Sequence, residues 1–184
     1  MLASVLETMG LVQSLPRDDG RQVHPLAAFP EAFCVKPSSI QYPSVVCSPS
    51  KHVALTLVPG ASAMAVVHVT NPTKYLIALH LSASHDFYTI RPPYTCLPPG
   101  RTIAIAITVS AADCLRVLNT PAPRKPDLLT LATASFKDVP AYLHSRLQTE
   151  VVQDVWQQIP PEYIATTTLH ASCSPWTTAA DDEP

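Results

Sequence analysis

Glycine and charged residues are scarce in this chain of 184 residues. Only four glycines are present, and Asp, Glu, Lys and Arg together make up 14% of the residues, against roughly 25% in an average soluble domain. Phosphate-binding loops and dinucleotide fingerprints need several glycines at fixed spacing, and neither pattern occurs. So few charges predict that part of the surface is covered in a complex, which is typical of a subunit of an assembly.

Long apolar runs and clusters of basic residues are also missing. No run reaches the roughly 18 apolar residues that a membrane span requires. The net charge is −2, and the densest basic pair is Arg124-Lys125, so no basic patch indicates a nucleic-acid surface. The sequence therefore predicts neither a transmembrane segment nor binding to nucleic acid.

The five cysteines do not form a recognisable framework. Their number is odd, no two of them have the CxxC spacing, and the first residues lack the basic region of a secretory signal. Disulfides are rare in reducing compartments, so this pattern predicts reduced cysteines and a cytoplasmic protein.

Two groups of side chains have residue types that can carry chemistry. His80, His85 and Cys96 are possible metal ligands, but they lack the paired short spacings of a structural zinc site. Cys114 and His144 are a possible nucleophile and base, but no elbow or oxyanion motif surrounds Cys114. The interpretation that we favour for both groups is structural. The sequence therefore predicts no catalytic residue, no metal and no cofactor, and the chain is expected not to be an enzyme.

Twenty prolines punctuate short runs of β-branched and apolar residues. Proline lacks an amide donor, so it bounds strands and marks turns. The clearest alternating run is 102–109, in which Ile103, Ile105, Ile107 and Val109 share one face. The other predicted strands are residues 53–57, 63–70, 75–82, 87–91, 128–134 and 166–172. Short strands with regular turn signals predict an all-β sandwich of the immunoglobulin-like type.

The rest of the chain divides into a helix, an arm and a tail. One short helix is predicted over residues 150–157, where two prolines follow, and a single helical turn over residues 111–115. Residues 1–44 are proline-rich and read as an N-terminal arm, whose first residues have the apolar spacing of a short amphipathic helix. We therefore expect the arm, a sandwich domain over residues 45–174 and an acidic tail over residues 175–184.

Several short motifs occur in an order that is typical of one family. The most specific are Asn71-Pro72-Thr73, Tyr88-Thr89-Ile90-Arg91-Pro92 and Leu97-Pro98-Pro99-Gly100. The others are Cys47 with Pro49, Val155-Trp156, Pro161-Glu162 and Leu169. Over residues 45–174 these motifs resemble the major sperm protein (MSP) domain, which is also the cytosolic domain of the vesicle-associated-membrane-protein-associated proteins. The resemblance implies a seven-stranded, immunoglobulin-like sandwich of MSP type.

The resemblance also implies a face that binds proteins. Membrane-contact members of the family bind acidic peptides with two phenylalanines, through lysines and small polar residues on one exposed face. The matching positions here are His80, Ser82, Ser84 and Thr130, and Arg91 lies at a strand end where its planar fork can reach a carboxylate. The cationic character of that face is therefore largely lost. Each lost exposed ion pair costs about 0.2–1 kcal/mol, so acidic-peptide binding is expected to be weakened by an order of magnitude or more.

These observations together predict a non-enzymatic structural or protein-binding module. We expect a subunit of a cytoskeletal or ciliary or flagellar (axonemal) assembly, located in the cytoplasm at the cytoskeleton, cilium or flagellum. Its partners would be other proteins of that assembly, with tubulin-associated proteins among the candidates. The alternative is a soluble adaptor that binds short acidic two-phenylalanine motifs at membrane contact sites.

Overall fold

The computed structural model describes residues 33–40, 44–120, 127–139 and 152–176, most of which lie in strands. The strands are β1 (Cys34–Val35), β2 (Val46–Ser48), β3 (His52–Leu57), β4 (Ala63–Thr70), β5 (Leu76–Ala83), β6 (Tyr88–Arg91), β7 (Tyr94–Leu97), β8 (Thr102–Val109), β9 (Asp127–Phe136) and β10 (Ile164–Pro175). The helices are α2 (Ala111–Leu118) and α4 (Val152–Gln158), and two short 3-10 turns are η2 (Pro37–Ser39) and η3 (Pro161–Tyr163).

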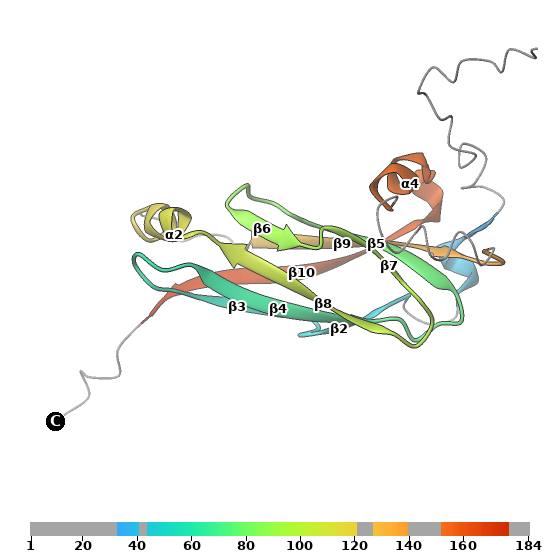
Figure 1. Cartoon of the computed structure of the whole chain (residues 1–184), viewed down its shortest axis with the longest axis horizontal. Coiled ribbons are helices and arrows are strands. Elements are labelled where there is room, and N and C mark those ends of the chain that lie inside the picture. Colours follow the sequence, from blue (N-terminus) through green and yellow to red (C-terminus); the bar gives the residue numbers. More distant parts are fainter. Residues whose placement is uncertain (1–32, 41–43, 121–126, 140–151, 177–184) are drawn as a thin grey trace, which may run out of the picture.

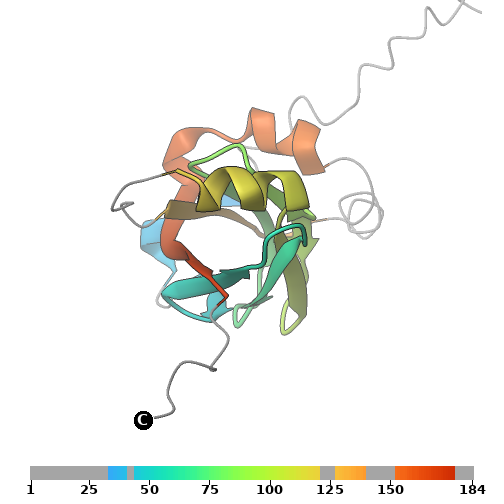
Figure 2. The same ribbon diagram turned by 90° about the vertical axis from the view of Figure 1, so that its left-hand side faces the viewer.

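The strands form two sheets that pack face to face, as Figures 1 and 2 show. Sheet A has the order β3-β10-β9-β5-β7, and β1 also pairs with β9. Sheet B has the order β2-β4-β8-β6. Paired strands are antiparallel except for β3 and β10, which are parallel. This arrangement confirms the predicted all-β sandwich.

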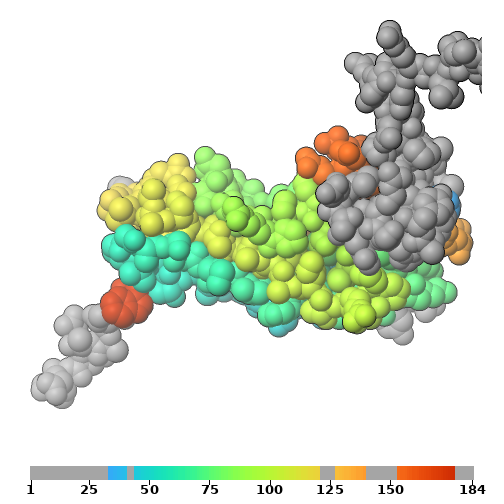
Figure 3. Space-filling model, viewed as in Figure 1, coloured from blue at the N-terminus to red at the C-terminus, as the bar shows by residue number. Residues whose placement is uncertain are grey.

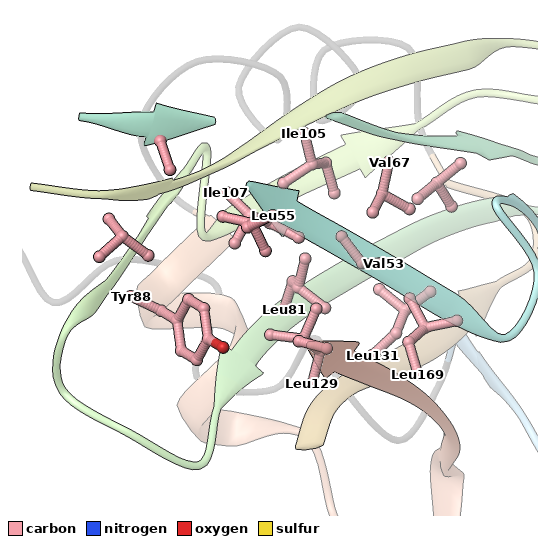
Figure 4. Packing of buried hydrophobic residues seen from close by; sticks show 14 of the residues in the cluster. Val53, Leu55, Val67, Leu81, Tyr88, Ile105, Ile107, Leu129, Leu131 and Leu169 are labelled. Atoms are coloured by element: carbon pink, nitrogen blue, oxygen red, sulfur yellow. The ribbon is translucent and has the colours of Figure 1, made fainter. Parts of the chain in front are cut away.

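The main core lies between the two sheets and follows from the alternation of apolar residues along the strands (Figure 4). In β8, Ile105, Ile107 and Val109 are buried, whereas the residues between them are more exposed. In β9, Leu129 and Leu131 belong to the same core. Burying an aliphatic side chain of this size stabilises the fold by about 1.5–3 kcal/mol. The alternation therefore decides which face of each strand turns inward, and all seven predicted strands are found.

The structure also contains elements that the sequence does not predict. The strands β1, β2 and β7 have two to four residues, which is too short to show a recognisable alternation. The helix α2 has eight residues rather than one turn. Its start is stabilised by Ser110, whose hydroxyl accepts the N–H of Asp113 at 3.1 Å. The helix predicted over residues 150–157 is found as α4, and residues 150–151 lie outside the described part.

The predicted arm and tail are described only in part. Residues 1–32 and 41–43 of the arm, including the predicted amphipathic helix, lie outside the described residues, as do residues 177–184 of the tail. Within the arm, Cys34 and Val35 are buried and pair with Phe136 and Ser135 at the end of β9. These two residues of the arm therefore form part of sheet A.

The two helices lie toward opposite ends of the sandwich (Figures 1 and 3). Figure 2 shows α2 crossing the end of the sandwich between the two sheets. Its buried residues Cys114 and Val117 join the core there. The helix α4 instead packs on sheet A from outside, where Val155 belongs to a second apolar cluster with Leu76 and Phe136. One helix therefore closes an end, and the other covers part of a face.

The Asn71 side chain joins turns from both sheets. It is fully buried, and its amide nitrogen donates to the carbonyls of Tyr75 and Leu97, each at 2.8 Å. Its amide oxygen accepts the N–H and the hydroxyl of Thr73 at 2.9 and 2.8 Å. The backbone of Asn71 also exchanges two hydrogen bonds with the turn at Gly100 and Arg101. The β4–β5 turn and the β7–β8 connection are therefore held together by one residue.

We expect the substitution Asn71→Ala to lower the free energy of unfolding by about 3 kcal/mol or more, because a buried polar group without a partner costs about 1–3 kcal/mol. Two carbonyls and one N–H would lose their partner. Asn71→Asp, which cannot donate to the carbonyls, should also be strongly destabilising, whereas Pro72→Ala in the same turn should have a much smaller effect. Urea denaturation measures the three values, and a loss below about 1 kcal/mol for Asn71→Ala would contradict this role.

Candidate functional site

The outer face of sheet A carries most of the side chains that the sequence assigns to a binding face. Ser82 of β5 pairs with Thr130 of β9, which pairs in turn with Thr168 of β10. Because Leu129 and Leu131 point into the core, Thr130 and its neighbours point outward. We call this surface the outer strip, and it consists of His80, Ser82, Ser84, Leu128, Thr130, Thr166, Thr168 and His170.

His80 lies at one end of the outer strip, within an aromatic group. Its ring stacks on that of Tyr94 with centroids 4.2 Å apart and an angle of 6° between the planes. The ring of Trp156 from α4 lies 5.6 Å away on a tilted plane. Burial lowers the pKa of His80 below its usual value. A position that is cationic in the peptide-binding members is therefore occupied by a neutral, stacked ring near neutral pH.

The hydroxyl groups of Ser84 and Ser82 bond within the sheet. Ser84 donates its N–H to the carbonyl of Leu128 at 2.8 Å, and its hydroxyl accepts the N–H of Leu128 at 3.1 Å. The Ser82 hydroxyl makes only a long contact of 3.5 Å with the carbonyl of Thr130. Ser84 therefore extends the pairing of β5 and β9 beyond the end of β5.

Arg91 is not part of the outer strip. It is exposed at the end of β6, where it pairs with Ala106 of β8 in sheet B. Tyr88 on the same strand is buried in the core between the sheets, so the alternation places Arg91 on the outer face of sheet B. The structure therefore brings His80, Ser82, Ser84 and Thr130 to one face and places Arg91 on the opposite one.

The helix α4 limits the outer strip on one side. Val155 and Ile159 pack against the outer-face residues Ala78, Cys96 and others of sheet A. Burial raises the pKa of Cys96 to about 12, so its thiol is protonated and a weak nucleophile at neutral pH. The covered half of the outer face is therefore a second core, and only the remaining half is open to a partner.

A polar cluster that the sequence does not predict lies beyond the other end of the outer strip. The carboxylate of Asp127 is 7% exposed, and its Oδ1 lies 3.1 Å from the Nε2 of His85. Its Oδ2 accepts the hydroxyl of Tyr88 at 2.6 Å. Burial, followed by the hydrogen bond to Asp127, raises the pKa of Tyr88. No sequence signal marks this cluster, because Asp127 of β9 lies 39 residues from Tyr88, and further from His85, in the chain.

The cluster borders a cavity of about 430 Å³, which we call the end pocket. It is lined by residues 85–87, by Arg116, Val117 and Thr120 of α2 and the residues after it, and by Asp127. The guanidinium of Arg116 lies 5.9 Å from the ring centre of Phe87. The pocket therefore combines an aromatic wall with a buried carboxylate.

The possible metal and nucleophile groups do not assemble among the described residues. Within that part of the chain, no three His, Cys, Asp or Glu side chains lie close enough to hold a metal ion. Cys114 is buried and its thiol faces the carbonyl of Val109 at 3.8 Å, whereas His144 lies outside the described residues. None of the described helices has the length and apolar character needed to cross a membrane.

No protein-family model and no curated protein matches the sequence. Solved structures with a similar fold include two proteins of Caenorhabditis elegans. SSP-19, described as an MSP-domain protein like family member, is 20% identical to this chain, with a TM-score of 0.46. The match covers 69% of this chain and 98% of SSP-19. The MSP family member WR4 is 14% identical, with a TM-score of 0.42, and the match covers 71% of this chain and 100% of WR4.

A human structure is similar in the same way. The ASH or PapD-like domain 7 of CEP192 is 14% identical, with 78% of this chain and 94% of the domain covered and a TM-score of 0.44. These structures include the MSP type of domain that the sequence motifs resemble. At such identities the similarity concerns the fold alone.

We expect His80 to make folding pH-dependent in the acid range. Because burial lowers its pKa from 6.5, the unfolded chain binds the proton at a higher pH than the folded protein does. The unfolded state is therefore favoured as the pH falls through about 6.5, and the free energy of unfolding decreases. His80→Gln should remove this part of the pH dependence. An NMR titration in which the folded His80 imidazole titrates at or above its value in urea would contradict this expectation.

Proposed function

We propose that the chain is a non-enzymatic protein-binding module that uses the outer strip of sheet A as its contact surface. The observation that supports this proposal is the composition of the strip, which contains no Asp, Glu, Lys or Arg side chain. Charged residues are depleted at the centres of protein interfaces. The strip offers hydroxyl groups and the half-exposed Leu128 on a paired sheet, so a partner can bind it without removing charges from water.

We further propose that this module is a subunit of a larger assembly of the cytoskeletal or ciliary kind. An assembly subunit uses more than one surface, and the outer face of sheet B is also poor in charge. Its exposed apolar residues include Val46, Met64 and Val66, and Met64 is 67% exposed. The division into an arm (residues 1–44), a sandwich (45–174) and an acidic tail (175–184) is part of this proposal, in which the arm adds contacts to the same assembly.

Site-specific photo-crosslinking in cells tests the contact surface. A photoreactive residue at Ser82 or at Thr168 should give covalent adducts with the same partner protein, because the two positions lie in one row on the outer strip. The matched control is Asp154, on the exposed face of α4. Adducts that are identical from all three positions, or adducts from Asp154 alone, would contradict the proposal. Identification of the adducts by mass spectrometry decides between cytoskeletal or ciliary proteins and proteins of membrane contacts.

The same surface is expected to bind acidic two-phenylalanine peptides poorly, because it lacks cations. In a titration calorimetry experiment, the unaltered protein should show no micromolar binding. Replacing both Ser82 and Leu128 by Lys should strengthen binding by about 2- to 30-fold, since each exposed ion pair contributes about 0.2–1 kcal/mol. The same positions replaced by Gln are the control. Micromolar binding by the unaltered protein would instead support the adaptor function.

A further inference from the structure

The end pocket contains a buried carboxylate, Asp127, that keeps acceptor capacity for a further donor. Asp127 is 7% exposed, its Oδ2 accepts the hydroxyl of Tyr88, and its Oδ1 lies 3.1 Å from the Nε2 of His85. An ionised carboxylate has about four acceptor positions, so acceptor capacity remains on both oxygens. A buried carboxylate is stabilised most by a cation that also donates hydrogen bonds. The geometry around Asp127 therefore favours a further donor that carries positive charge.

Arg116, which lines the pocket, is already shared by two other carboxylates. The Nη2 of Arg116 lies 3.1 Å from Oδ1 of Asp113 and 3.3 Å from Oδ1 of Asp86. The guanidinium of Arg116 is therefore already paired with Asp113 and Asp86, while the carboxylate of Asp127 lines the same pocket. An anionic ligand would be repelled by Asp86 and Asp127, whereas a cationic one would be attracted by them.

The aromatic wall of the pocket suits the same type of ligand. The rings of His85 and Phe87 are stacked with centroids 5.2 Å apart and planes at 12°. Arg116 already places its guanidinium over Phe87 at 5.9 Å, which is within the range of a cation–π contact. The aliphatic stem of a basic side chain can lie along apolar surface while its head reaches a carboxylate.

The end pocket adjoins the outer strip. Ser84 directly precedes His85 in the chain, and Leu128 directly follows Asp127. Ser84 and Leu128 lie at the end of the strip and are hydrogen-bonded to each other. A partner segment that binds along the strip toward Ser84 and Leu128 therefore reaches the end pocket. The cavity of about 430 Å³ has room for a side chain at that point.

We propose that the end pocket receives a Lys or Arg side chain of the partner protein, with Asp127 as its counter-ion and Phe87 as its apolar wall. The incoming cation donates to Oδ1 of Asp127 in place of His85. This inference rests on the proposed function, because it gives the chemistry of the partner segment that lies on the outer strip. The partner is therefore basic at this position, in contrast to the acidic peptides that other members of the resembled family bind.

Two-dimensional NMR with small probes tests the pocket without a known partner. N-acetyl-arginine amide is titrated into the full chain, and the analogous citrulline amide serves as the uncharged control of the same shape. The arginine probe should shift the amide signals of residues 85–87 and 116–120 in a saturable way, and the citrulline probe should not. Asp127→Asn should weaken arginine binding by about tenfold, whereas Asp154→Asn on the exposed face of α4 should leave it unchanged.

A second variant keeps the test informative if Asp127→Asn does not fold. His85→Ala frees Oδ1 of Asp127 and one face of Phe87, so it should strengthen binding of the arginine probe several-fold. Equal shifts with citrulline, no shifts with either probe, or weaker binding by His85→Ala would overturn the inference. Crosslinks from Ser82 and Thr168 that persist despite such a result would leave the proposed function in place. Arginine binding without those crosslinks would retain the pocket and reject the outer strip.

Discussion

The buried amide of Asn71 is the constraint on which the arrangement of the two sheets depends. Its side chain uses both amide hydrogens and its oxygen in hydrogen bonds, and its backbone bonds to the turn at Gly100. Gly100 has φ of +68°, a conformation that glycine adopts without strain. Strands of sheet A and sheet B thereby leave this end of the molecule in fixed relative positions. The apolar residues between the sheets then pack in one register.

The two halves of the outer face of sheet A differ. One half of the outer face of sheet A is covered by α4 and becomes a second core around Phe136 and Ala134. The other half stays open as the outer strip, which is polar but uncharged. A polar, uncharged surface is compatible with water when the chain is alone and is inexpensive to desolvate when a partner binds. Charged residues are scarce in the whole sequence, and the surface where a contact is proposed has no Asp, Glu, Lys or Arg side chain.

Charge is instead concentrated beyond the end of the strip. Asp86 and Asp113 both pair with Arg116, and Tyr88 donates a short hydrogen bond of 2.6 Å to Asp127, which lines the same pocket. The fold thereby buries the carboxylate of Asp127. An interaction of this carboxylate with a cation is screened less than one at the surface. The outer strip and the end pocket together form one surface. The strip lacks charged side chains, and the pocket favours a cation.

The sequence by itself determined the alternating strands, the turns and the sandwich class, because burial of one face imposes a period of two. It also assigned His80, Ser82, Ser84, Thr130 and Arg91 to one face, and the first four do lie on one face, whereas Arg91 lies on the other sheet. Strands β1, β2 and β7 were too short to leave a pattern. Only the tertiary structure decided that His80 stacks on Tyr94 beside the tilted ring of Trp156, and that Asp127 meets His85 and Tyr88. The reason is physical: the protonation and pairing of these groups depend on burial by residues that are distant in the chain, which no local pattern records.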